Sequence, residues 1–241
     1  MTKQAVIIGV GASKGLGAAL ARRFSKGGLS VILAGRTEAK LQAIEEEIVN
    51  VGGQAASVVC DVTDEASVNS LFASVAETGT LDAVLFNAGN NAIIPFADLD
   101  AETFEAFWRV GCMGGFLTAK AAAPIMLEQG HGSLLFTGAS GSMRGKPSFA
   151  HFAAAKAGLR MLSQSLAREY GSKGIHVAHV IVDGVIDGDM VGSRFAEYLD
   201  ALGPDGGLNP DDMAEAFWML HSQPRSTWTQ ELDLRPYSEN W

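Results

Sequence analysis

The most constraining feature of the sequence is the stretch Ala5–Gly17, in which an apolar run breaks into glycines and then opens a helical pattern. This pattern predicts a buried strand, a tight turn and the start of a helix. Gly11, Gly15 and Gly17 form G-x-x-x-G-x-G, which allows unusual backbone angles and the close approach of a pyrophosphate to amides at the helix N-terminus. Turn glycines between a strand and a helix also occur without any nucleotide, so this stretch alone leaves both interpretations open.

Short apolar runs alternate with longer helical patterns along the rest of the chain. The predicted strands are Val6–Gly9, Val31–Ala34, Ala56–Cys60, Ala83–Phe86, Ser133–Phe136 and Val177–Val182. The predicted helices are Gly15–Lys26, Glu38–Asn50, Glu65–Glu77, Ala101–Gln129 and Phe149–Tyr170. This alternation is typical of β-α-β units. It predicts an α/β fold with a parallel sheet, helices on both faces and ligands at the carboxyl ends of the strands.

The length and composition of the chain indicate one domain and argue against nucleic acid as a partner. With 241 residues, of which 47% are hydrophobic, we expect a single domain over residues 1–241 around a continuous core. The formal net charge of -9 argues against nucleic acid as a partner. The segment Gly184–Leu208 is rich in glycine and aspartate and lacks a clean period, so we expect a lid there.

Cysteine usage and hydropathy favour a cytoplasmic protein without a metal. Cys60 and Cys112 are the only cysteines and lack metal-ligand spacing, so we expect a reducing compartment and no metal site. No apolar stretch reaches the roughly 18 residues of a membrane span. Gly9 and Gly11 interrupt the apolar N-terminus, which therefore predicts a first strand and not a signal peptide, and we expect no membrane partner.

The residue after the second predicted strand bears on the choice of a dinucleotide cofactor. An NAD-binding chain usually has an acid there, which accepts hydrogen bonds from the ribose hydroxyls, whereas this chain has Arg36. Arg36, with Ser13 and Lys14 in the glycine turn, offers a fork and a point charge for a 2′-phosphate, which favours NADP over NAD. A solvated surface arginine is the alternative interpretation.

Two further strand ends have short polar groups where adenine and ribose edges would lie in such a sheet. Asp61 and Val62 follow the third predicted strand, and Asn87, Ala88 and Gly89 follow the fourth. Either strand end alone would be an ordinary turn.

The order and spacing of GASKGLG, GR, DVT and NAG resemble the short-chain dehydrogenase/reductase family over essentially the whole chain. The resemblance implies a Rossmann-like three-layer sandwich, with a doubly wound parallel sheet of about seven strands and a nicotinamide cofactor. It also implies a homodimer or homotetramer packed through Ala101–Gln129 and Phe149–Tyr170. The expected cofactor contacts are Gly11, Ser13, Lys14, Gly15, Leu16, Gly17, Arg36, Asp61, Val62, Asn87, Ala88, Gly89, Lys156 and Gly184.

The family's catalytic set of Asn, Ser, Tyr and Lys matches this chain at the lysine only. In the stretch FAAAK, Lys156 stands at the lysine position and Phe152 at the tyrosine position. Ala139 stands at the serine position, and Gly111 in VGCMG stands at the asparagine position. The resemblance therefore implies an atypical, partly degenerate active site, in which Lys156 still holds the ribose but residue 152 has no proton to donate.

Other side chains are candidates for the missing proton donor. Ser140 follows the serine position, and Tyr198 lies in the predicted lid. His151 precedes Phe152, and because neighbouring helix residues lie about 100° apart we expect it to point mostly elsewhere. His179 lies within an apolar run and is expected to be a hydrogen-bonded core residue.

After the sixth predicted strand, the family's usual proline and threonine are replaced. Asp183 stands at the proline position and Gly188 at the threonine position. Because a carboxylate repels phosphates, we expect weaker anchors for the pyrophosphate and the carboxamide.

Two functions from different classes remain open. The first is an NADP-dependent oxidoreductase acting on a small-molecule substrate that the sequence does not name. The second is a non-catalytic nucleotide-binding or assembly protein on the same fold. Residues Trp228–Trp241 are a candidate second contact between subunits, with a strand and tail folded on the same subunit as the alternative.

Overall fold

Seven parallel strands form one sheet in the computed structural model, which describes residues 2–89, 91–193 and 195–239. The strands are β1 (Lys3–Ile8), β2 (Ser30–Gly35), β3 (Ala55–Val59), β4 (Thr80–Phe86), β5 (Gly132–Thr137), β6 (Ile175–Val182) and β7 (Glu231–Leu234). Their order across the sheet is β3-β2-β1-β4-β5-β6-β7. The predicted α/β fold with a doubly wound, Rossmann-like sheet is confirmed.

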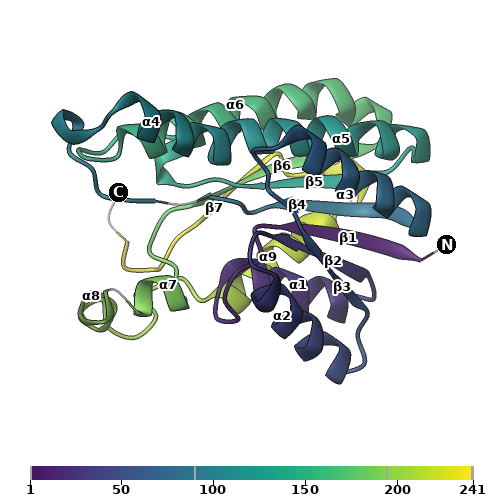
Figure 1. Ribbon diagram of the computed structural model, residues 1–241, viewed down its shortest axis with the longest axis horizontal. Coiled ribbons are helices and arrows are strands. Elements are labelled where there is room, and N and C mark those ends of the chain that lie inside the picture. Colours follow the sequence, from purple (N-terminus) through teal and green to yellow (C-terminus); the bar gives the residue numbers. More distant parts are fainter. Residues whose placement is uncertain (1, 90, 194, 240–241) are drawn as a thin grey trace.

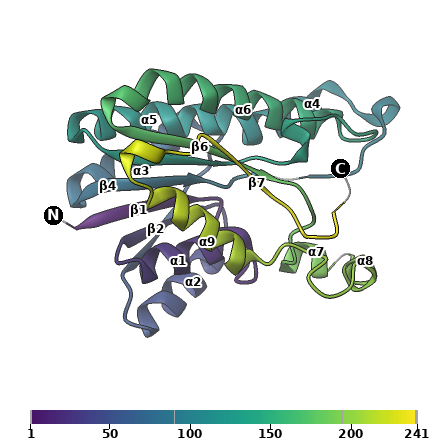
Figure 2. The same cartoon turned by 180° about the vertical axis from the view of Figure 1, so that it is seen from behind.

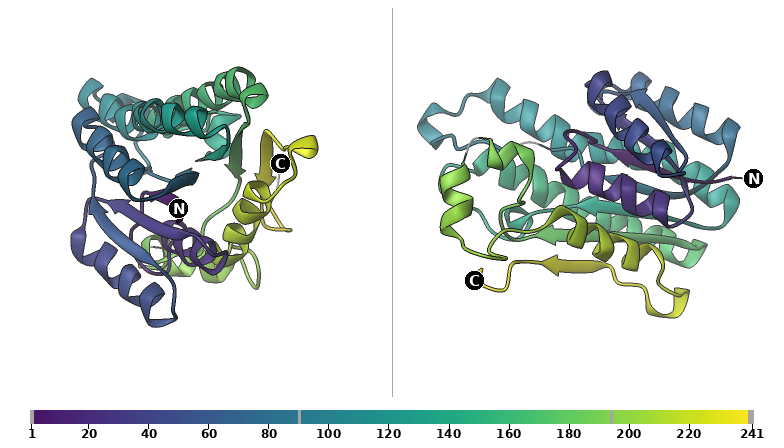
Figure 3. Two further views of the ribbon diagram at one scale, coloured as in Figure 1. Left: turned by 90° about the vertical axis from the view of Figure 1, so that its right-hand side faces the viewer. Right: turned by 90° about the horizontal axis from the view of Figure 1, so that it is seen from below.

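Helices cover both faces of the sheet and complete the three layers (Figure 1, Figure 3). One layer contains α1 (Leu16–Lys26), α2 (Glu38–Asn50) and α9 (Pro210–His221). The other contains α3 (Glu65–Thr78), α4 (Ala101–Trp108), α5 (Gly114–Gln129) and α6 (Ala150–Tyr170). Successive residues of β1 join opposite cores: Ile7 packs in the core with α1, and Ile8 in the core with α3 and α5. Burial on both faces explains why the strands are continuous apolar runs without polar alternation.

The strand order reverses between β1 and β4, and this reversal positions the site. β1 pairs with β2 on one side and β4 on the other, so that Ile8 lies opposite both Ala34 and Phe86. Ligands of doubly wound sheets bind outside the carboxyl ends of the strands at such a reversal. The glycine turn after β1 and the turn at residues 87–89 after β4 therefore flank the expected cofactor crevice.

Some elements differ from those predicted. The helix predicted over residues 101–129 contains a π-helical turn at Arg109–Met113, which separates α4 from α5. The sequence patterns do not predict α9, whose Trp218 ring meets Phe24 of α1 edge-on with centroids 5.2 Å apart. β7 pairs with β6, so this part of the stretch considered as a subunit contact folds on its own subunit. Trp241, at the end of that stretch, lies outside the described residues.

The helical stretch Ala101–Gln129 has the length of a membrane-spanning helix and a mean hydropathy of 1.4 over its most apolar window. The expectation that no stretch is long and apolar enough is therefore wrong. Half of that window is buried inside the fold, as in a core helix. Length and composition thus do not assign this stretch to a membrane.

The segment 184–208 connects β6 to α9 and extends beyond the carboxyl edge of the sheet. It contains α7 (Asp189–Gly192) and α8 (Ala196–Ala201), which lie beyond the ends of the strands (Figure 2). A parallel bridge pairs Ile186 with Leu208, so the two ends of the segment meet at its base. Movement of this segment as a lid stays a prediction.

Candidate cofactor and active site

The turn after β1 holds helix α1 close to the sheet and leaves another side of the turn open. Gly9 has a φ of 90°, and a Cβ at Gly17 would lie 2.5 Å from the carbonyl oxygen of Gly9. A Cβ at Gly11, by contrast, would meet no atom within 4 Å. The N-cap residue of α1 is Gly15, which has no side chain to cap the first amides of the helix. These features fit a pyrophosphate, which needs an open approach to the glycines and uncapped amides at a helix N-terminus.

The three side chains predicted to bind a 2′-phosphate differ in their contacts. Arg36 follows β2 and is exposed, and within the described part of the chain it forms no hydrogen bond or ion pair. Ser13 Oγ donates to Glu47 Oε1 at 2.7 Å, and Lys14 Nζ donates to Asp187 Oδ1 at 3.0 Å. Arg36 is thus the one predicted 2′-phosphate ligand that is not bonded to a carboxylate.

The polar residues after β3 and β4 both form hydrogen bonds with nearby backbone groups. Asp61 accepts hydrogen bonds from the backbone N–H of Thr63 at 2.9 Å and from its hydroxyl at 2.8 Å, and both lower the pKa of the carboxyl. Asn87 Nδ2 donates to the carbonyl oxygen of Gly9 at 3.4 Å, which joins the turn after β4 to the glycine turn. Three other predicted cofactor contacts have side chains in the core, namely Leu16, Val62 and Ala88.

Lys156 of α6 lies at the carboxyl edge of the sheet with 6% of its surface exposed. Its ammonium group donates a hydrogen bond to the carbonyl oxygen of Thr137, at the end of β5, at 2.7 Å. Burial lowers the pKa of Lys156 to about 8. A Cβ at Gly89 would lie 3.3 Å from Nζ. The structure therefore brings the predicted catalytic lysine next to the predicted cofactor contact Gly89, between the ends of β4 and β5.

Phe152, one helical turn before Lys156, lines a cavity of about 260 Å³ at this edge of the sheet. Two of the alternative proton donors, Ser140 and Tyr198, line the same cavity, as does the predicted cofactor contact Gly184. His151 does not line it. Its fully buried ring packs against Phe107 with centroids 4.2 Å apart, in the direction that helical spacing predicts.

Ala139 and Gly111, the other two positions compared with the family's catalytic set, are both buried. The backbone N–H of Ala139 donates to Ser142 Oγ at 3.1 Å, across the 3-10 turn Ser140–Ser142. Gly111 lies in the π-helical turn, and a Cβ there would be 3.0 Å from the Cβ of Ala155. Helix α6 therefore packs so closely on this turn that a larger residue at position 111 would require it to shift.

Asp183 is not a free carboxylate, which corrects the expectation that it repels the phosphates. Arg144 Nη2 donates to its two carboxylate oxygens at 2.8 and 2.9 Å, and Arg235 forms a second ion pair with it at 3.8 Å. The sequence could not predict these pairs, because Arg144 and Asp183 lie on separate loops. The two guanidinium groups offset the negative charge, so weak binding of a pyrophosphate does not follow from Asp183.

Comparison with known proteins assigns this arrangement to a family. A family model described as short chain dehydrogenase matches residues 4–199. The chain belongs to the short-chain dehydrogenase/reductase family of NAD(P)-dependent oxidoreductases.

Relatives in this family match nearly the full chain. The short-chain dehydrogenase/reductase eriH of Hericium erinaceus is 32% identical over 234 residues, covering 92% of each protein. The solved short-chain dehydrogenase from Rhodopseudomonas palustris is 33% identical with a TM-score of 0.84, covering 98% of this chain and 99% of that one. A metagenomic short-chain oxidoreductase solved in complex with NADP is 27% identical with a TM-score of 0.83, covering 97% of each chain. Structural homologues thus bind NADP(H), and the family uses NAD(P).

Sequence reasoning missed a buried network behind the loop after β5 of this short-chain dehydrogenase/reductase. Ser142 Oγ lies 3.3 Å from His179 Nε2, and His179 Nδ1 lies 3.3 Å from Glu231 Oε2. Arg160 donates two hydrogen bonds to Glu231, at 2.6 and 2.8 Å. Burial lowers the pKa of His179 to about 4, so its ring is neutral near pH 7. Through Ser142 the network fixes the backbone of Ala139, and a histidine within an apolar strand was the one sequence signal for it.

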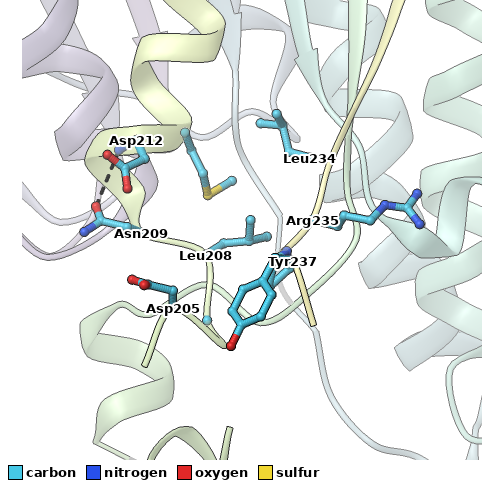
Figure 4. Close-up of a pocket in the computed structure, with 10 residues that line it drawn as sticks. Asp205, Leu208, Asn209, Asp212, Leu234, Arg235 and Tyr237 are labelled. Carbon is cyan, nitrogen blue, oxygen red and sulfur yellow. Dashed lines mark hydrogen bonds between the residues drawn. The ribbon is translucent and has the colours of Figure 1, made fainter. Parts of the chain in front are cut away.

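A second cavity, of about 370 Å³, lies between β7 and the start of α9 (Figure 4). Leu208 and Leu234 contribute apolar surface, and Asp205, Asp212 and Tyr237 also line the cavity. None of the residues predicted to bind the cofactor or to act in catalysis lines it, so the reaction is not assigned to this larger cavity. Over residues 2–89, 91–193 and 195–239, no group of three His, Cys, Asp or Glu side chains is placed to hold a metal ion.

Proposed function

We propose that this short-chain dehydrogenase/reductase prefers NADP(H) and has an atypical active site. Arg36 supports the cofactor preference, because its exposed guanidinium stands after β2 where an NAD-dependent protein usually has an acid. A guanidinium suits a phosphate and has no advantage for a ribose hydroxyl. The relative solved in complex with NADP supports the same preference.

The described residues fit such a cofactor at the reversal of strand order. Amides of the glycine turn would hold the pyrophosphate, Arg36 the 2′-phosphate and Lys156 the nicotinamide ribose. When bound, NADPH supplies a hydride. The residues of this chain would orient the substrate in the cavity beside Phe152 and deliver a proton to it.

The observation that carries the atypical site is the contact of Phe152 with the cavity, one turn from Lys156. Neither residue 152 nor residue 139 has a hydroxyl group, and loss of a positioned general acid typically lowers a rate by a factor of about 10² to 10⁴. We therefore propose that simple ketones are reduced slowly or not at all. Ser140 and Tyr198, which line the cavity, are the candidate donors for another class of substrate.

The same observation favours a second function, a nucleotide-binding or assembly role without turnover. Under this alternative the glycine turn, Arg36 and Lys156 still bind the nucleotide, but no substrate is reduced. Turnover of any carbonyl or enoyl compound in a substrate panel with NADPH would select the oxidoreductase.

Cofactor choice is tested by Arg36→Ala. We expect this change to weaken NADPH binding by about 1.5–3 kcal/mol, the range of a hydrogen bond to a charged group, and to leave NADH binding almost unchanged. Titration calorimetry with both cofactors measures the difference, and Arg168→Ala, at the far end of α6, is the matched control. Equal affinities of the wild type for NADPH and NADH would contradict the proposal.

The atypical site is tested by restoring the two hydroxyl groups. Phe152→Tyr combined with Ala139→Ser should place a phenol and a hydroxyl beside Lys156 and raise ketone reduction above the wild-type rate. Neither single change needs to suffice, because such groups act as a unit. Rapid ketone reduction by the wild type that survives Lys156→Ala would show that both the acid and the lysine act elsewhere.

We further propose that the protein works in the cytoplasm as a homodimer or homotetramer, without nucleic acid or membrane partners. The acidic net charge of -9 and the two free cysteines support this setting. The substrate is then a small molecule that fits the cavity of about 260 Å³.

A further inference from the structure

Residues 187–189, which we call the acidic strap, hold the middle of the glycine turn. Lys14 Nζ donates to Asp187 Oδ1 at 3.0 Å, and the backbone N–H of Lys14 donates to Asp189 Oδ2 at 3.2 Å. In return the backbone N–H of Asp189 donates to the carbonyl oxygen of Lys14 at 2.9 Å. A Cβ at Gly188 would lie only 2.6 Å from that oxygen, so the strap and the turn are in direct contact.

The strap occupies the donors that an anionic cofactor would need. Backbone amides of the glycine turn are the groups that a pyrophosphate approaches, and the Lys14 ammonium is a candidate partner of a 2′-phosphate. In the structure both donors of Lys14 are taken by carboxylate oxygens of Asp187 and Asp189. A carboxylate and a phosphate oxygen accept the same hydrogen bonds, so the strap and the cofactor compete for Lys14.

The backbone of the strap also forms hydrogen bonds that do not depend on the carboxylates of Asp187 and Asp189 or on the side chain of Lys14. The N–H of Asp187 donates to the carbonyl oxygen of Leu208 at 2.8 Å, and the N–H of Gly188 donates to that of Ile186 at 2.9 Å. The bridge between Ile186 and Leu208 closes the base of the segment 184–208. Replacing a carboxylate of the strap by an amide should therefore leave the fold intact.

We propose that Asp187 and Asp189 determine cofactor affinity and choice by competing with the cofactor's phosphates for Lys14. This inference rests on the proposed binding of NADP(H) at the glycine turn. Asp187 affects only the cofactor with a 2′-phosphate, because it withholds the ammonium of Lys14. Asp189 affects NADPH and NADH alike, because it withholds a backbone amide.

The size of the effect follows from the exposure of the pair. The side chains of Lys14 and Asp187 are 61% and 44% exposed, and such solvent-exposed ion pairs are weak. The strap therefore tunes affinity and does not block the site. For Asp187→Asn we expect NADPH to bind about twofold to fivefold more tightly, with the gain shrinking as salt is added.

The test is a titration of NADPH and NADH into the full chain and its variants. Asp187→Asn should tighten NADPH and leave NADH unchanged, whereas Asp189→Asn should tighten both. In a Lys14→Met background, Asp187→Asn should change NADPH binding by less than about twofold, because the shared partner is gone. Asp200→Asn on α8, with the same change of charge but no contact with the turn, is the control and should have no effect.

Several outcomes would overturn the inference. Weaker NADPH binding by Asp187→Asn would mean that the strap supports the bound cofactor. An equal gain from Asp200→Asn, or a gain that persists with Lys14→Met, would assign the effect to net charge alone. If neither the wild type nor any variant binds a nicotinamide nucleotide, the proposed function itself fails. If the wild type binds NADPH and the strap variants do not tighten it, only the competition is disproved.

Discussion

Burial of a lysine side chain without a carboxylate is costly, and Lys156 bears this cost. Among the described residues no carboxylate contacts its ammonium group, which donates a hydrogen bond to the carbonyl oxygen of Thr137 at 2.7 Å. Desolvation therefore dominates and lowers its pKa from 10.5 to about 8. A residue that destabilises the fold yet lies at the proposed cofactor site is a sign of selection for function over stability.

Replacement of Lys156 by methionine should stabilise the protein near pH 7 by about 1–2 kcal/mol, after the lost hydrogen bond to Thr137 is counted. The gain depends on pH. Below pH 8 the lysine is charged in both folded and unfolded states, and the wild type bears the full cost. Between pH 8 and 10.5 the folded wild type loses the proton that the unfolded chain keeps, so the wild type recovers stability and the advantage of methionine shrinks.

Urea unfolding of both proteins at pH 7 and near pH 10 measures this difference. NADPH affinity should fall in the same variant, which would separate the functional from the structural role of the lysine. A methionine variant less stable than the wild type at pH 7 would show that the ammonium group is compensated inside the fold.

At the scale of elements, the unit formed by β1, the glycine turn and α1 divides a structural role and a proposed binding role between two different glycines. Gly17 lets α1 approach the carbonyl oxygen of Gly9, where a Cβ would lie at 2.5 Å. A Cβ at Gly11 would have no neighbour within 4 Å, so the absence of a side chain there leaves the space above the turn open. Substitution by alanine should therefore mainly affect stability at Gly17 and mainly affect NADPH binding at Gly11.

Gly17→Ala should destabilise the protein by about 1–3 kcal/mol, the usual cost of overpacking, because the helix must move away from the strand. Gly11→Ala should change stability by less than about 0.5 kcal/mol. It should nevertheless weaken NADPH binding about tenfold or more, since the new methyl group points into open space at the expected pyrophosphate. Thermal unfolding and titration calorimetry distinguish the pair. A stable Gly17→Ala protein, or unchanged NADPH binding by Gly11→Ala, would refute the division of roles.

At the scale of the whole molecule, the outer surface of the layer formed by α4, α5 and α6 exposes large apolar side chains. Phe116 of α5 is 42% exposed and Met161 of α6 is 51% exposed. These are the two long helices expected to pack between subunits. Exposed apolar side chains on neighbouring helices are typical of an interface between subunits.

Light scattering should therefore return a mass of two or four times the 25.3 kDa of one chain. Phe116→Lys combined with Met161→Lys should shift the protein towards the monomer, because two charges would be buried at the interface without partners. Val49→Lys on α2, equally exposed but in the opposite layer, should leave the mass unchanged. A wild-type mass near that of one chain would exclude the predicted assembly.

The sequence by itself determined what depends on neighbouring positions. Apolar runs and helical periods located β1 to β6 and most of the helices. The glycine spacing located the turn after β1. The four-residue interval between Phe152 and Lys156 placed both residues on one side of α6. These patterns did not predict helix α9 or the π-helical turn at Gly111, where Ala155 of α6 packs close to the backbone.

The tertiary structure alone decided which charges meet. Lys14 and Asp187 are 173 residues apart in the chain, and Arg144 and Asp183 are 39 apart, so no local pattern relates them. From the sequence, Lys14 is a free cation for a phosphate and Asp183 a repelling anion. In the folded protein each is paired with an opposite charge. The reason is physical: periodicity is set by bonds along the chain, whereas electrostatic pairing depends on distances through space that exist only once the sheet and its loops have assembled.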